Sequence, residues 1–155
     1  MSNILKDIFK DKVVIVGIGN TLKGDDAFGP VFIERLKGAA GCPLIDAGVT
    51  PENHTKKIAE QKPDKVLLVD AADLGKKPGE WEILKEDEIL KSGFTTHDMS
   101  PALFINYLKE TTGADIYLLG VQPERVVLGS EMSESVKKTM EEVLKAIEEI
   151  PRTLP

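Results

Sequence analysis

Continuous apolar runs alternate with amphipathic segments along this chain. The run at 12–19 is short, rich in β-branched residues and ends in glycines, which is typical of a strand buried on both faces, and we expect it to be the central strand of a sheet. Apolar runs at 43–48, 65–73 and 115–123 predict three more strands. The segment 79–85 alternates between apolar and polar residues, which predicts a strand at an edge of the sheet.

Amphipathic segments between these strands predict helices. Apolar residues recur at helical spacing over 28–36, and the segments 51–61 and 101–113 each begin with a proline, which is tolerated in a first helical turn. From Ser133 onward, one apolar stripe opposes pairs of Glu and Lys, which predicts a closing helix. The alternation predicts an α/β fold: one three-layer α/β/α domain, residues 1–155, with helices on both faces of a mainly parallel, twisted sheet.

Size and charge narrow the functional classes. A chain of 155 residues suffices for one domain with a hydrophobic core and is too short for two ordinary ones. The net charge of -6 argues against nucleic acid as a partner, because neutralising phosphates needs a surplus of Lys and Arg. Every apolar run is shorter than the roughly 20 residues that span a bilayer, the first residues lack a signal-peptide pattern, and the lone Cys42 excludes an internal disulfide. We therefore expect a cytoplasmic protein that is not inserted in a membrane.

Three reactive side chains follow predicted strand ends or precede a predicted helix. Asp26 follows the first strand, Asp70 ends the run at 65–73, and His97 lies in the loop before the helix at 101–113. Since parallel sheets bind ligands at the carboxyl ends of their strands, all three could face one crevice. Carboxylate oxygen and imidazole nitrogen suit a divalent cation such as Zn, Mn, Fe or Ni, but the same groups could form an acid/base set. Spacing alone leaves both interpretations open.

The glycine-bearing turn at 19–30 resembles the start of a phosphate-binding loop but does not fit one. It lacks the third glycine of a dinucleotide fingerprint and the Gly-Lys-Ser/Thr ending of a P-loop. Asp25 and Asp26 already offer carboxylates to the helix N-terminus and would repel a pyrophosphate. A cation fits better, and we expect one of the two aspartates to cap the helix.

Four segments, in this order and spacing, carry a resemblance to a known family. They are VVIVGIGNTLKGDDAFGP at 13–30, KVLLVDAADLG at 65–75, TTHDMSP at 95–101 and LLGVQPE at 118–124. Together they resemble the hydrogenase maturation endopeptidases, especially the archaeal and bacterial members that process membrane-bound or formate-hydrogenlyase-type [NiFe] hydrogenases. The resemblance implies a protease that removes a C-terminal extension from the large-subunit precursor after nickel insertion.

The resemblance also implies roles for the three strand-end residues. By motif, the metal-contacting positions of the family fall on Asp26, Asp70 and His97, which would also be the catalytic residues. Asp26 is the one we expect to double as general base. The nickel would arrive bound to the partner, the [NiFe]-hydrogenase large-subunit precursor, so the resting protein would be metal-free and, we expect, monomeric.

One further expectation concerns the surroundings of the crevice. The rim formed by Phe94, Met99 and the loop 47–55 would recognise the partner.

Two alternative functions stay open: a metal-sensing or chaperone-like module that has the fold without cleavage, and a metal-dependent hydrolase of small phosphorylated substrates. The second would need basic residues in the crevice, for which Lys23 is the obvious candidate.

Overall fold

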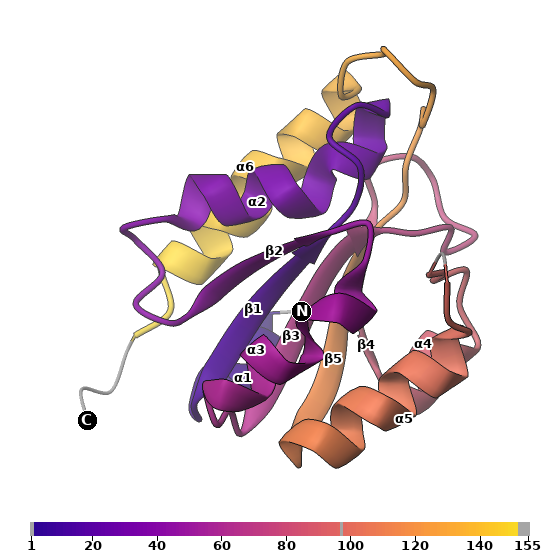
Figure 1. Cartoon of the computed structure of the whole chain (residues 1–155). Coiled ribbons are helices and arrows are strands. Elements are labelled where there is room, and N and C mark those ends of the chain that lie inside the picture. Colours follow the sequence, from indigo (N-terminus) through magenta and orange to yellow (C-terminus); the bar gives the residue numbers. More distant parts are fainter. Residues whose placement is uncertain (1, 97, 152–155) are drawn as a thin grey trace.

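A single five-stranded sheet organises the molecule in the computed structural model, which describes residues 2–96 and 98–151 (Figure 1). The strands, in the spatial order β2-β1-β3-β5-β4, are β2 (Leu44–Gly48), β1 (Val13–Ile18), β3 (Lys65–Ala71), β5 (Asp115–Val121) and β4 (Trp81–Lys85). The first four run parallel, and β4 pairs with β5 antiparallel at the edge. The predicted edge strand is thereby confirmed, whereas the centre of the sheet is β3 rather than the expected β1.

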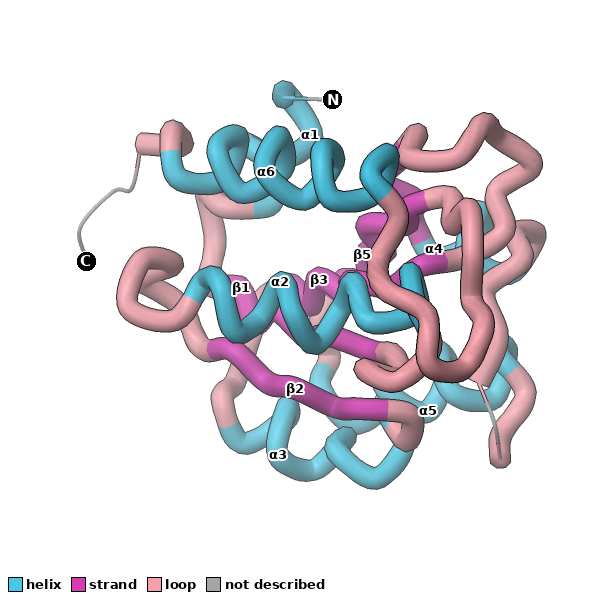
Figure 2. The backbone as a smooth tube through the Cα atoms, turned by 90° about the horizontal axis from the view of Figure 1, so that it is seen from above, coloured by secondary structure: helices cyan, strands magenta, loops and turns pink. Residues whose placement is uncertain are grey.

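Helices cover both faces of the sheet (Figure 2). On one face lie α1 (Ser2–Ile8), α2 (Phe28–Leu36) and α6 (Glu134–Glu148), and on the other lie α3 (Thr55–Glu60), α4 (Glu86–Leu90) and α5 (Pro101–Thr112). Two short 3-10 helices, η1 (Gly24–Ala27) and η2 (Pro51–His54), precede α2 and α3. This arrangement confirms the predicted three-layer α/β/α fold.

The strands are buried because each layer packs its own hydrophobic core against them. All six residues of β1 are buried, as are the five interior residues of β3. Alternate strand residues point to opposite faces, so Ile15 joins the core under α2 and α6 while Val16 joins the core under α3 and α5. Such continuous burial explains why these strands read as unbroken apolar runs.

Two helices were not anticipated, and one predicted helix is divided. Both α1, with 7 residues, and α4, with 5, are too short for their periodicity to be separated from that of a loop. The predicted helix 51–61 begins as η2 and continues as α3. No helix within the described residues is long and apolar enough to cross a membrane.

Candidate functional site

A pocket of about 240 Å³ opens where the carboxyl ends of the parallel strands meet the loops that follow them. Residues from six segments line the pocket. Three segments are strand ends or follow them: Ile18 and Gly19 at the end of β1, Val49 and Pro51 after β2, and Asp70 and Ala71 at the end of β3. The others are Lys23 and Asp26 around η1, Thr95 and Thr96 before α5, and Val126 after β5. Two carboxylates that lie 44 residues apart in the sequence (70 − 26) therefore share one cavity. Strand-end reasoning predicted this meeting.

Asp26 is held by the turn that leads from β1 into η1. Its Oδ2 accepts a hydrogen bond from the Asn20 backbone N–H at 2.9 Å, and the Asn20 side-chain oxygen in turn accepts one from the Leu22 N–H at 2.9 Å. Gly19 adopts φ +148°, and a Cβ at this position would lie 1.9 Å from the Asp26 carbonyl oxygen, so only glycine fits. The half-buried Asp26 carboxylate keeps its Oδ1 without a hydrogen bond from any described residue, and this oxygen can serve a ligand.

Asp70 is the penultimate residue of β3 and is only 6% exposed. Burial raises the pKa of this carboxyl well above its usual range, the nearby Asp26 charge raises it further, and the Ala71 N–H acts in the opposite direction. In the protein alone, burial and the Asp26 charge therefore both favour the protonated form of the Asp70 carboxyl. A cation between the two carboxylates would remove this repulsion and favour loss of the proton.

Replacing Asp70 with asparagine should make the folding stability of the protein fall less as pH rises. Because the folded-state pKa of Asp70 lies above the unfolded-state value, the folded chain binds the extra proton, and stability falls as pH rises from the unfolded pKa of about 3.9 toward the folded one. The amide that replaces the carboxyl is neutral at every pH. The unfolding temperature of Asp70→Asn, measured from pH 4 to 8, should lose less with rising pH than that of the wild type. Parallel curves for the two proteins would contradict this assignment.

Asp25 has the opposite environment, although it is adjacent to Asp26 in the sequence. Its side chain is 0% exposed and accepts hydrogen bonds from the backbone N–H groups of Glu124, Arg125 and Ser133 at 2.8, 2.9 and 2.7 Å, and from the Ser133 hydroxyl. Burial alone would raise the pKa of Asp25, but the hydrogen bonds from Ser133, Arg125 and Glu124 outweigh it and lower the pKa. Asp25 thus stays ionised and fixes the loop between β5 and α6.

The expected helix cap is therefore wrong. Neither η1 nor α2 receives a side-chain capping hydrogen bond, because Asp25 turns to the 122–133 loop and Asp26 to the Asn20 N–H. Capping and loop attachment use the same carboxylate chemistry, so the sequence could not separate them.

His97, the third predicted site residue, lies outside the described residues, so its role stays a prediction. Its neighbours Thr95 and Thr96 line the pocket, and the Thr96 hydroxyl donates to the Met99 carbonyl. Among the residues that the structure does describe, no group of three or more His, Cys, Asp or Glu gathers in a form that could hold a metal ion. Asp26 and Asp70 alone would supply two ligands.

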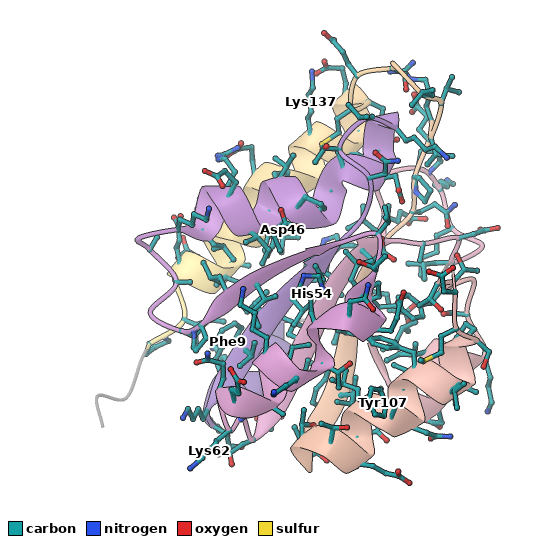
Figure 3. All side chains as sticks on the ribbon, in the orientation of Figure 1. Phe9, Asp46, His54, Lys62, Tyr107 and Lys137 are labelled. Carbon is teal, nitrogen blue, oxygen red and sulfur yellow. The ribbon has the colours of Figure 1, made fainter. Side chains whose placement is uncertain are left out.

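Only part of the predicted rim lies at the pocket, and its role in recognising the partner stays a prediction. Val49 and Pro51 from the loop 47–55 line the pocket, whereas Phe94 is buried and packs against Phe104 with ring centroids 6.4 Å apart. Phe94 therefore belongs to the core and is not available to a partner. His54 lies on the same segment (Figure 3), and its Nδ1–H donates a hydrogen bond to the Thr50 carbonyl oxygen at 3.1 Å.

Sequence reasoning missed the contribution of the loop after β5. Val126 reaches the pocket from this loop, which Asp25 holds beside η1. The strand-end rule, applied to β5 as it was to β1 and β3, would have indicated this segment.

Comparisons of sequence and of structure with known proteins all find members of one protein family. A family model described as hydrogenase maturation protease matches residues 32–150. The hydrogenase 3 maturation protease of Escherichia coli is 36% identical over 138 residues, which cover 87% of this chain and 88% of that protein. A crystal structure of the [NiFe] hydrogenase maturation protease HycI from Thermococcus kodakarensis superposes with a TM-score of 0.83 at 39% identity, covering 95% and 97% of the two chains. The solution structure of the endopeptidase HycI from Escherichia coli gives a TM-score of 0.78 at 35% identity, covering 88% and 89%.

Proposed function

This chain belongs to the hydrogenase maturation protease family, and we propose that it removes the C-terminal extension from the large-subunit precursor of a [NiFe] hydrogenase once nickel is in place. The observation that carries the proposal is the pocket shared by Asp26 and Asp70 at the ends of neighbouring parallel strands. The nickel is cargo of the substrate. Two carboxylates, with His97 as the third donor that the resemblance supplies, form an open ligand set that leaves positions for groups of the precursor.

The charge of the pocket suits a substrate that carries a cation. Lys23 is the sole basic side chain among the described residues that line it, against two carboxylates. Without a cation, burial and the Asp26 charge raise the pKa of the Asp70 carboxyl and favour its protonated form. An unloaded precursor would bring nothing to offset the cost of ionising Asp70, whereas the cation of a loaded precursor would be attracted to the two carboxylates. This difference supports nickel as the signal that the precursor is ready.

The two carboxylates are suited to different tasks. Asp26 is half-buried, is fixed through one oxygen by the Asn20 N–H and presents the other, so it can accept a proton from a water molecule that attacks the scissile carbonyl. Asp70 is more deeply buried, and its proton is the one that a bound cation would displace. Substrate-bound nickel would add Lewis acidity at the carbonyl.

The two alternative functions find less support. A hydrolase of phosphorylated metabolites would need several cations to bind the phosphate, but the described lining holds two carboxylates and one lysine. A module without cleavage lacks a specific observation in its favour, since the similar proteins are proteases.

The intact mass of a large-subunit precursor, measured after incubation with this protein, tests the proposal. We expect a nickel-loaded precursor to lose one C-terminal peptide and an unloaded precursor to keep its full mass. Equal cleavage of loaded and unloaded precursors would reject nickel gating. An unchanged mass of every precursor, despite binding, would reject the cleavage itself.

A further inference from the structure

We propose that an apolar strip beside the pocket, formed by Leu22, Val126, Val127 and Leu128, binds the precursor chain next to the scissile bond as an extended segment. The proposal rests on the proposed function, because it assigns the strip to the same substrate. The exposed fractions of the four side chains are 66%, 49%, 60% and 68%. Three of them are consecutive, and such a run of large apolar residues in contact with water indicates a binding surface.

The strip is attached to the domain at several points, so its geometry is fixed before a substrate arrives. Asp25 accepts hydrogen bonds from the N–H groups on one side of it, at Glu124 and Arg125, and from Ser133 on the other. The Gly129 N–H donates to the Leu22 carbonyl oxygen at 2.8 Å, which joins the two parts of the strip. Binding to it would therefore cost little ordering of the loop.

The main chain of the strip leaves backbone groups open to a partner at Val126 and Leu128, on either side of the first residue of a turn. The carbonyl oxygen of Val127 is used inside the molecule, by the backbone N–H of Ser130 at 3.0 Å and by its hydroxyl. Val126 and Leu128, on either side, make no backbone hydrogen bond with any described residue. These unpaired backbone groups are open to the main chain of an extended peptide, which can form hydrogen bonds with them.

The strip leads directly into the pocket. Val126 belongs to both, since it lines the cavity that holds Asp26 and Asp70. A chain bound along Val126 and Leu128 would thus lead toward the two carboxylates. Four apolar side chains are too few to hold a folded surface, but they suit an extended peptide, for which main-chain hydrogen bonds supply affinity and side-chain contacts supply specificity. The occupant is therefore the unfolded segment of the precursor that flanks the cleaved bond.

The double variant Leu22→Ser/Leu128→Ser tests the apolar contacts. The control is the double variant Leu90→Ser/Leu103→Ser, which changes two exposed leucines on α4 and α5, outside the strip. With nickel-loaded precursor as the substrate, the first variant should raise KM about tenfold, the effect of losing two partly buried leucine contacts, while kcat stays within about twofold of the wild type. The matched variant should leave both constants unchanged. An unchanged KM for the first variant, with normal cleavage by the wild type, overturns the strip; no cleavage by the wild type rejects the proposed function instead.

The main-chain pairing is tested separately at Leu128. Ser130 N–H bonds to the Val127 carbonyl, and Gly129 has φ +83°, so residues 127–130 form a turn whose second position accepts proline. Leu128→Pro should therefore fold normally while losing the N–H, and Leu128→Ala loses a similar apolar area but keeps it. We expect KM of the proline variant to exceed that of the alanine variant about fivefold, the effect of one hydrogen bond. Equal KM values overturn the pairing.

Amide exchange gives a readout without catalysis. A synthetic peptide that spans the scissile bond should slow the exchange of the Val126 and Leu128 N–H groups, observed by NMR. Unchanged exchange at both residues in the saturated complex would contradict the proposal. So would a dimer in sedimentation that Leu128→Ser dissociates, because it would assign the strip to a second copy of this chain.

Discussion

Asp26→Ala should lower kcat/KM for the nickel-loaded precursor by about 10³-fold, the effect of removing a general base. The variant removes the carboxylate oxygen that is available in the pocket and leaves the Asn20 N–H without its acceptor. Because Asp26 is half-buried at a turn, most of the effect should fall on kcat and little on the folding stability. Mass spectrometry of the precursor over time measures the rate, and thermal unfolding measures the stability.

Two further variants make this result specific. Asp26→Asn keeps the shape and an oxygen for the Asn20 N–H but cannot accept a proton, so its loss of activity should be nearly as large. Asp46→Asn removes a carboxylate charge from the exposed surface of β2, outside the pocket, and should retain activity (Figure 3). Cleavage at the wild-type rate by Asp26→Ala would remove Asp26 from the chemistry, and equal losses in the Asp26 and Asp46 variants would indicate a general charge effect.

Asp25→Ala should reduce the free energy of unfolding by about 3–5 kcal/mol, because it leaves three backbone N–H groups and a hydroxyl without their acceptor in a buried place. For a domain of this size, that corresponds to a fall of about 10 °C in Tm. The effect should be largest near neutral pH. As pH falls through the lowered folded-state pKa of Asp25, the wild type loses this stabilisation, so the two proteins converge in acid.

A matched variant removes one hydrogen-bond donor and keeps the Asp25 charge. Ser133→Ala removes one hydroxyl donor and keeps the three backbone N–H donors, so it should cost only about 1 kcal/mol. Chemical denaturation of the variants measures these differences. A loss below about 1 kcal/mol for Asp25→Ala would show that the 122–133 loop is held by its other contacts.

The fold could be predicted because its strands are buried on both faces. Continuous burial leaves a continuous apolar run in the sequence, and the antiparallel edge strand β4 leaves an alternating one. The short helix α4 leaves no such pattern, since its 5 residues are too few for a period to appear. The central place of β3 depends on pairing between distant strands, which periodicity within one strand does not report.

The site could be predicted as far as strand ends define it. The strand-end rule brings Asp26 and Asp70 into one pocket because their strands are parallel neighbours. The rule does not tell adjacent aspartates apart: Asp25 and Asp26 have the same chemistry, and only the direction of each side chain gives one to the 122–133 loop and the other to the pocket. Phe94 was misplaced for a similar reason, since an aromatic residue in a loop can pack inward or outward.

The bond between Asp25 and Ser133 joins residues 108 positions apart, which has a consequence for the order of folding. Contacts of such long range form late, because the intervening chain must first be brought together at an entropic cost. We expect the loop that completes the pocket wall to settle after β5 has joined the sheet and α6 has begun. We therefore expect a partly folded molecule to form its core before its pocket is complete, so that proteolytic competence arises late in folding.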